Sequence, residues 1–291
     1  MIPLKDNIPT IRFPIVTVLL IAVNLAVLGW QLLFTGDEFA DRELRELGIT
    51  EIDLQTIEYG AIPYRILNGG GECAVGAVSR QEGRARTEVV CEGTAEFDEA
   101  EDLDAQGVAP FVGIDTAPWW ITVVTSMFLH AGILHLAGNM LFLWVFGNNI
   151  EDSMGRLRFL AFYLLAGGVA VYAQAMLEPG SAVPTIGASG AVSGVLGGYI
   201  LLHPRARVLT LVIIIFFFTF IEIPALVMLG IWFALQAVPV FSDLASPDVA
   251  GGEGGIAYLA HVGGFIFGLL AIKLFARREL IHGPGAPPAR A

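Results

Sequence analysis

The sequence has few charged residues for its length of 291, and those it has are mostly acidic. Only 15% of the residues are Asp, Glu, Lys or Arg, whereas 55% are hydrophobic. This composition excludes an ordinary soluble domain and favours a protein that crosses a membrane several times. The formal net charge is −12. A nucleic-acid-binding protein needs a basic surface, so we expect no nucleic-acid partner.

Several signals of other protein classes are missing. No small-residue cleavage site follows the apolar run from Pro14 to Phe34, so we predict a retained span and not a signal peptide. The start is rich in neither Arg nor Ser, which argues against an organelle transit peptide. The alternative of a transporter with a polar core predicts an internal inverted repeat, and the sequence has none. We therefore expect an integral, multi-pass membrane protein in a prokaryotic plasma membrane.

Six apolar segments approach or exceed the roughly 20 residues that a membrane-spanning helix needs. They cover about 14–34, 119–149, 157–177, 187–202, 222–241 and 257–276. A further apolar run, 208–221, has 14 residues and is too short to span. We predict a buried or re-entrant connector there. The expected fold is an all-α polytopic membrane protein with a bundle of six transmembrane helices.

The placement of basic residues supports six spans over seven. Those outside the acidic segment flank the first, second, third, fourth and sixth spans: Lys5, Arg12, Arg156, Arg158, Arg205, Arg207, Lys273, Arg277, Arg278 and Arg290. With six spans, all ten lie on one side, which the positive-inside rule makes cytosolic. We therefore predict that both termini are cytosolic.

The acidic residues are concentrated between the first two spans. Residues 35–118 contain 19 of the 28 Asp and Glu, but only six of the 16 Lys and Arg. Within this segment we predict a helix over 41–54, a hairpin over 72–91 and a solvated acidic run over 96–104. The expected division is 1–35 for the N-terminus and first transmembrane helix, 36–117 for an acidic extracytosolic insert, 118–276 for a core with five transmembrane helices and 277–291 for a disordered cytosolic tail.

The only two cysteines, Cys73 and Cys91, both lie in this insert. A cysteine pair in a polar segment outside the cytosol favours a disulfide, although two free, partly buried thiols are the alternative. Closing a loop of this size would contribute about 3 kcal/mol in the chain-entropy description.

A serine between glycines opens the fourth span, in the run Gly187-Ala188-Ser189-Gly190. Polar groups at membrane depth are rare unless they are functional or satisfied by partners. At a helix N-terminus, free N–H groups and the helix dipole favour an oxyanion beside Ser189. The alternative is a packing motif with a capping serine, and these four residues taken alone are a weak signal for a nucleophile.

The sixth span contains His261, followed by glycines at a spacing that matches the fourth span. Gly190, Gly194 and Gly198 in one span, and Gly264 and Gly268 in the other, recur every four residues. Such stripes of small residues allow close helix packing. This packing would bring Ser189 to His261 as nucleophile and general base. A lone histidine with only a structural role is the alternative.

The second span holds His130, His135 and Asn139. His135 and Asn139 are four residues apart and share one helix face, where they could donate to the oxyanion of a tetrahedral intermediate. His130 could fix a loop. The two histidines are five residues apart and lack the glutamate of H-E-x-x-H, so we expect no metal and no cofactor.

Along the chain, the block with His130, His135 and Asn139 comes first, Gly187–Gly190 second and the His261 motif last. In this order and spacing, the three motifs resemble the rhomboid family over about residues 120–275. The resemblance implies an intramembrane serine endopeptidase that cleaves transmembrane protein substrates within the lipid bilayer by a Ser–His dyad. It implies that Ser189 is the nucleophile, His261 the base, and His135 and Asn139 the oxyanion donors. Further positions that it marks as structural are His130, Gly187, Gly190 and Gly264, and also Glu151 and Gly155 of a Glu-x-x-x-Gly pattern.

The chain departs from the family at two places. Ile121 and Thr122 replace a Trp-Arg pair, and Ser193 replaces an aromatic residue that packs on the histidine in many members. The alternative function is a catalytically silent rhomboid-like protein that binds membrane clients. A further hypothesis is that the glycine-rich segment 251–255 forms a lid over Ser189 and His261.

Overall fold

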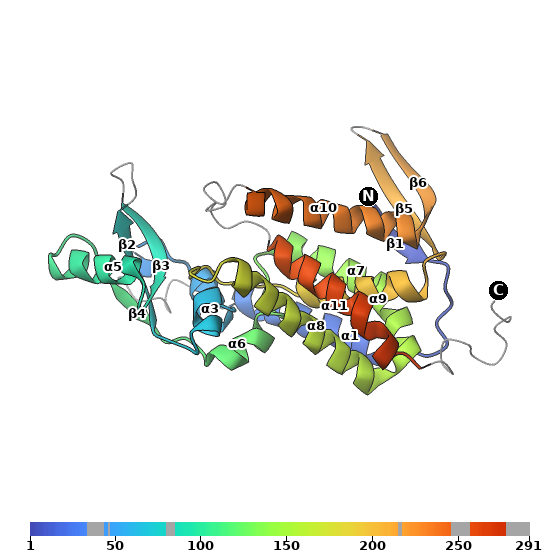
Figure 1. Cartoon of the computed structure of the whole chain (residues 1–291), viewed down its shortest axis with the longest axis horizontal. Coiled ribbons are helices and arrows are strands. Elements are labelled where there is room, and N and C mark those ends of the chain that lie inside the picture. The colour runs from blue at the N-terminus through green and yellow to red at the C-terminus, as the bar shows by residue number, and fades with distance from the viewer. Residues whose placement is uncertain (34–43, 46, 80–84, 215–216, 246–256, 278–291) are drawn as a thin grey trace. The chain divides into compact units, whose positions relative to one another are not determined.

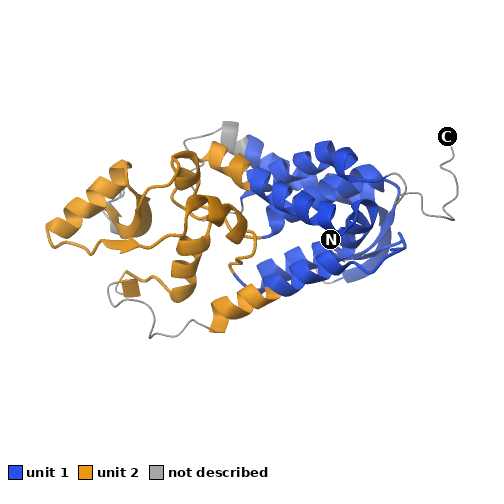
Figure 2. Cartoon of the chain, turned by 90° about the horizontal axis from the view of Figure 1, so that it is seen from below, with its two compact units in different colours: residues 1–24, 132–170, 188–291 blue, residues 25–131, 171–187 orange. Residues whose placement is uncertain are grey.

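The computed structural model describes residues 1–33, 44–45, 47–79, 85–214, 217–245 and 257–277. The chain forms two compact units, which Figure 2 shows in different colours. Unit 1 contains residues 1–24, 132–170 and 188–291, and unit 2 contains 25–131 and 171–187. The hypothesised lid at 251–255 and the tail after Arg277 lie outside the described residues. The expected domain limits stay a prediction.

Four of the described helices are long and apolar enough to cross a membrane. They are α1 (Ile15–Leu33), α7 (Ile133–Met154), α8 (Arg156–Leu177) and α11 (Tyr258–Phe275). Two further helices occupy the other expected spans: α9 (Ser189–Leu202) and α10 (Ala225–Ala245), whose apolar stretch over Ala225–Phe241 is, like α9, shorter than the four. The protein is thus a mostly helical, multi-pass membrane protein, and the count of six spans stays a prediction.

The expected second span, 119–149, is two helices and not one. A short helix, α6 (Trp119–Thr125), precedes α7. The chain tightens after α6, where the N–H groups of Met127 and Phe128 bond carbonyls three residues back. Gly132 then enters α7 in an extended conformation. The apolar character of the whole stretch conceals this break.

For the run 208–221 we predicted a buried or re-entrant connector, and the burial is wrong because its second half is largely exposed. This run forms two antiparallel strands, β5 (Arg207–Ile214) and β6 (Phe217–Pro224), and Figure 1 shows them projecting from the helices of unit 1. The N-terminal strand β1 (Ile2–Asp6) pairs with β5, so the sheet order is β1-β5-β6. Most of β6 is exposed. The β-branched and aromatic residues of this run favour strands. However, β1, one of the two partners of β5, lies about 200 residues earlier in the sequence.

Two carboxylates hold the N-terminal part of the chain against the helices of unit 1. One oxygen of Asp6 accepts hydrogen bonds from the Tyr199 hydroxyl at 2.5 Å and from the Asn149 amide at 2.6 Å. Burial raises the pKa of Asp6 above its ordinary value, and these two bonds oppose that shift. Glu151 accepts from the backbone N–H groups of Val16 and Thr17, and also from the Thr17 hydroxyl. It therefore satisfies free donors at the start of α1.

Unit 2 contains the acidic insert, which combines helices with a β-sheet. Its further elements are α3 (Glu51–Tyr59), α4 (Pro63–Leu67), β2 (Cys73–Ser79), β3 (Ala85–Cys91), α5 (Ala95–Ala105) and β4 (Val112–Ile114). Three strands form a sheet in the order β3-β2-β4. Together with the sheet of unit 1, this sheet makes the expectation of an all-α fold wrong.

Local predictions for the insert had different outcomes. The hairpin over 72–91 is confirmed, since β2 and β3 pair with Cys73 opposite Cys91. Their sulfur atoms form a disulfide. The helix predicted over 41–54 is confirmed only in part: residues 44–45 are helical and α3 begins at Glu51, whereas 47–50 are not helical and 41–43 and 46 lie outside the described residues. Thr50 and Asp53 form a reciprocal cap there. The acidic run lies in α5, whose surface is largely exposed.

The insert packs against other parts of unit 2. Ala61 pairs with Thr185 in an isolated bridge, and the Tyr64 N–H donates to the Ser181 carbonyl. Ala61 and Ile66 share a buried apolar cluster with Val171 and Ala175 of α8. The insert is therefore not a free loop, since it is anchored to the segment that precedes α9.

The closest helix packing in unit 1 is between α9 and α11, which lie side by side in Figure 1. A Cβ atom added at Gly264 would overlap the Gly190 carbonyl oxygen, and one at Gly268 would overlap that of Gly194. Gly197 likewise has no room beside the Phe265 carbonyl. The glycine stripes bring the two backbones into direct contact.

We expect Gly268→Ala to lower the free energy of unfolding by about 1–3 kcal/mol, because the new methyl group must displace backbone. Gly230→Ala is the matched control, since α10 has open space at Gly230. It should be neutral or stabilise the protein by up to about 1 kcal/mol through helix propensity. Unfolding in detergent followed by circular dichroism measures both. Equal stability of the two variants would contradict the packing described for α9 and α11.

Candidate active site

Ser189 is the first residue of α9, at the end of a glycine-dependent turn. Gly187 has φ of +115°, a region that side chains other than glycine rarely adopt. Within unit 2, its N–H donates to the Ser126 carbonyl at 2.8 Å. Gly190 faces Ala170 of α8, where a Cβ atom would overlap the alanine methyl group. The residues around Ser189 are thus required by backbone conformation and close packing.

Ser189 and His261 form a hydrogen-bonded pair. The Ser189 hydroxyl lies 2.7 Å from Nε2 of His261 on α11. Both side chains are half-buried. Gly264, one turn after His261, lies against the backbone of Gly190. The contact that the glycines allow is therefore the contact that sets the distance between hydroxyl and imidazole.

The other imidazole nitrogen of His261 also has a partner. Nδ1 lies 2.7 Å from Oε1 of Gln236 on α10. An amide oxygen only accepts hydrogen bonds, so Nδ1 must carry the proton. In a neutral imidazole, Nε2 is then the acceptor, and the Ser189 hydroxyl donates to it. This tautomer is the one that a general base needs.

An aromatic ring from a different helix lies beside His261. The Trp232 ring centroid is 6.1 Å from that of His261, with 38° between the planes. Ser193, the residue that replaces the expected aromatic, donates its hydroxyl to the Ser189 carbonyl at 2.6 Å. Trp232 of α10 therefore occupies the neighbourhood of the histidine where a residue of α9 was expected.

His135 and Asn139 lie on one face of α7, a helix that packs against α9. Asn139 is 8% exposed, and His135 is half-buried. His135 lies close enough to His261 for a positive charge on one imidazole to disfavour a positive charge on the other. The structure thus brings His135 into the surroundings of the dyad, and Asn139 lies one turn further along the same helix.

His130 belongs to unit 2. It is 1% exposed, its backbone N–H donates to the Gln31 side chain at 3.1 Å, and its Nδ1 bonds the Phe128 carbonyl at 3.2 Å. These contacts fit the expectation that His130 orders the chain between α6 and α7. Its structural role stays a prediction.

Two residues of the site, Trp232 and Gln236, were not predicted from the sequence. A signal for them is present: Gln236 is a polar residue in the apolar run 222–241, and Trp232 lies four residues before it. Residues at this spacing share a helix face. The sequence does not show that this face meets His261.

The chain is similar to known rhomboid proteins. A family profile for the rhomboid domain matches residues 117–278. Mitochondrial rhomboid protein 1 of Saccharomyces cerevisiae is 30% identical over 154 residues, which cover 52% of this chain and 40% of the yeast protein. Rhomboid protease GluP of Bacillus subtilis is 40% identical over 107 residues, 36% of this chain and 20% of that protein.

Not all relatives carry a protease name. Inactive rhomboid protein 1 of Drosophila melanogaster is 33% identical over 96 residues, 33% of this chain and 7% of that protein. The matched residues span less than half the length of each of these three relatives. Several relatives are named as mitochondrial, so the comparisons do not support the expected prokaryotic plasma membrane. The profile match and these relatives together establish that the chain is an integral membrane protein of the rhomboid family.

Proposed function

We propose that the protein is an intramembrane serine endopeptidase that cleaves transmembrane protein substrates. The observation that carries this proposal is the 2.7 Å contact between the Ser189 hydroxyl and Nε2 of His261. A serine hydroxyl is a weak nucleophile until an adjacent base accepts its proton. The hydrogen-bonded chain from Ser189 through His261 to Gln236 supplies a base in the required tautomer.

In the proposed reaction, the Ser189 oxygen attacks the carbonyl carbon of the scissile peptide while its proton moves to Nε2 of His261. The carbonyl oxygen becomes an oxyanion that His135, Asn139 and the Ser189 N–H stabilise. The imidazolium then gives its proton to the leaving amine, and the C–N bond breaks. A water molecule, deprotonated by His261, releases the acyl group and restores Ser189.

Gln236 acts in this proposal as a positioning residue. It accepts a hydrogen bond from Nδ1 and so fixes both the tautomer and the ring orientation of His261. An amide is uncharged, and therefore it stabilises the imidazolium less than a carboxylate would. Trp232 limits the space into which the ring can turn.

The wider arrangement that we propose has six spans, with both termini cytosolic and the insert with its disulfide on the opposite side. The four long helices and the two shorter apolar helices support six crossings. The two partners that we propose are transmembrane substrates and the lipid bilayer, and substrates would reach the dyad from the bilayer.

A catalytically silent protein that binds membrane clients is the second candidate. The relative named as an inactive rhomboid protein favours keeping it. The two candidates differ in whether the Ser189 hydroxyl reacts. A fluorophosphonate probe tests this reaction without a known substrate, because it traps a serine that an adjacent base activates.

We expect the purified protein to react with the probe at Ser189 and to cleave a single-span reporter in vesicles. Ser189→Ala and His261→Ala should each abolish labelling and cleavage. The double variant should be no worse, because the two residues act as a unit. Ser193→Ala is the matched control, a serine one turn away whose hydroxyl faces the Ser189 carbonyl. It should retain both activities. An unlabelled, folded wild type would favour the silent protein.

Asn139→Ala should lower kcat by about 100-fold to 1000-fold, as expected for the loss of one oxyanion donor. KM should change little, because the bond strengthens in the transition state. Steady-state kinetics on the reporter measure both values. A raised KM with an unchanged kcat would assign Asn139 to substrate binding.

Gln236→Leu should lower kcat about 10-fold to 100-fold, because Nδ1 loses its acceptor and the wrong tautomer becomes populated. Gln236→Glu keeps an acceptor for Nδ1, so it should be more active than Gln236→Leu. It should also shift the acid limb of the rate–pH profile to higher pH, since a carboxylate stabilises the imidazolium. Kinetics from pH 5 to 9 provide this readout. An unchanged profile in Gln236→Glu would show that Gln236 serves packing alone.

A further inference from the structure

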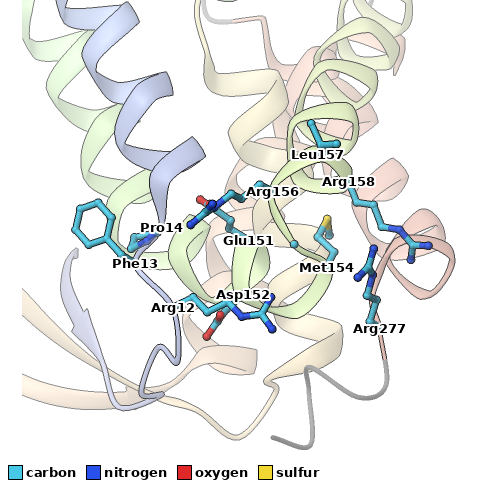
Figure 3. Close-up of a pocket in the computed structure, with 11 residues that line it drawn as sticks. Arg12, Phe13, Pro14, Glu151, Asp152, Met154, Arg156, Leu157, Arg158 and Arg277 are labelled. Carbon is cyan, nitrogen blue, oxygen red and sulfur yellow. The ribbon is translucent and has the colours of Figure 1, made fainter.

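A basic cavity lies in unit 1 apart from the dyad. It has a volume of about 470 Å³ and is formed by the segment before α1, the end of α7, the start of α8 and Arg277, the second residue after α11. Four arginines line it: Arg12, Arg156, Arg158 and Arg277 (Figure 3). We refer to it below as the arginine pocket.

The two carboxylates in the arginine pocket already have partners. Glu151 accepts from the backbone at the start of α1, and Asp152 accepts from the Ile11 N–H at 2.5 Å. Among the described residues, the structure pairs none of the four arginines with a carboxylate. Four guanidinium groups outnumber the two carboxylates that line the same cavity, so its lining carries a surplus of positive charge. Their arrangement therefore favours an anionic ligand.

Backbone contacts hold two of these arginines at the cavity. Arg158 donates from its guanidinium to the Phe275 carbonyl at 3.2 Å. The backbone N–H of Arg277 donates to the Ser153 carbonyl at 2.8 Å, which fixes the chain after α11 against the end of α7. In Figure 3 the side chains of Arg158 and Arg277 lie next to each other. Adjacent guanidinium forks suit the oxygens of a phosphate group.

The arginine pocket also has an apolar part. Phe13 is 67% exposed and Leu157 is 84% exposed, and both line the cavity beside the arginines. They lie at the ends of α1 and α8, two helices long and apolar enough to span. A membrane protein presents such helix ends at the level of the lipid headgroups. A ligand that matches both parts carries a phosphate and an apolar chain.

We propose that the arginine pocket binds the headgroup of an anionic phospholipid, with the phosphate among the arginines and the acyl chains along Leu157 and Phe13. Basic pockets between transmembrane helices are known to hold such headgroups. A soluble phosphate ester shares the phosphate chemistry but leaves the exposed apolar rim without a partner. This proposal does not depend on proteolytic activity.

Native mass spectrometry of the full chain released from detergent provides the test. We expect one dioleoyl phosphatidylglycerol to be retained per chain, and phosphatidylcholine to be retained at least 10-fold more weakly. Arg156→Gln/Arg277→Gln should reduce phosphatidylglycerol binding at least 10-fold. Arg205→Gln/Arg207→Gln removes the same charge from residues outside the pocket, and it should bind like the wild type.

Two further arms separate the remaining readings. Arg156→Lys/Arg277→Lys keeps the charge, so partial recovery of binding would show that the glutamine variant had not simply misfolded. Glycerol phosphate should compete poorly. Equal binding of both phospholipids, or an unaffected Arg156→Gln/Arg277→Gln variant, would overturn the proposal. Full competition by glycerol phosphate would assign the pocket to a soluble phosphate and overturn the lipid assignment.

Discussion

The contact between the backbones of α9 and α11 is the constraint on which the proposed chemistry depends. Ser189 and His261 are each attached to one of these helices, and their side chains are too short to meet across an ordinary helix interface. Gly264 and Gly268 on α11 and Gly197 on α9 lack the side chains that would hold these two helices apart, and Gly190 and Gly194 allow α9 to pack equally closely on α8. With no driving force from water exclusion between helices in lipid, close packing of this kind also holds such helices together. The same residues thus serve stability and geometry.

α10 completes the surroundings of the histidine. Its residues Trp232 and Gln236 contact the ring and Nδ1 of His261, so that both nitrogens of the imidazole have partners. A histidine that is satisfied on both sides needs no acidic third member to hold its tautomer. The same arrangement explains how a serine can stand at position 193, where many rhomboid proteins have an aromatic residue.

The polar groups at the arginine pocket divide into two sets. Glu151 and Asp152, at the end of α7, accept hydrogen bonds from backbone N–H groups near the start of α1 and so tie these two segments together. Among the described residues, none of the arginines around them is paired with a carboxylate, and Arg158 donates only to the Phe275 carbonyl. The surplus of positive charge at these helix ends is what the positive-inside rule detects in the sequence, and the cavity gives that surplus a defined place.

The sequence by itself determined the membrane class, most of the apolar helices and the family, because composition, spacing and motifs are local, and it singled out Ser189 and His261, whose side chains the structure brings into contact. It also predicted the hairpin that carries Cys73 and Cys91. It could not determine the pairing of β1 with β5 or the contacts of Trp232 and Gln236 with His261. These features depend on contacts between segments distant in the chain, and an apolar run looks the same whether its residues face lipid, another strand or His261. Only the tertiary structure decides which face of each element meets which partner.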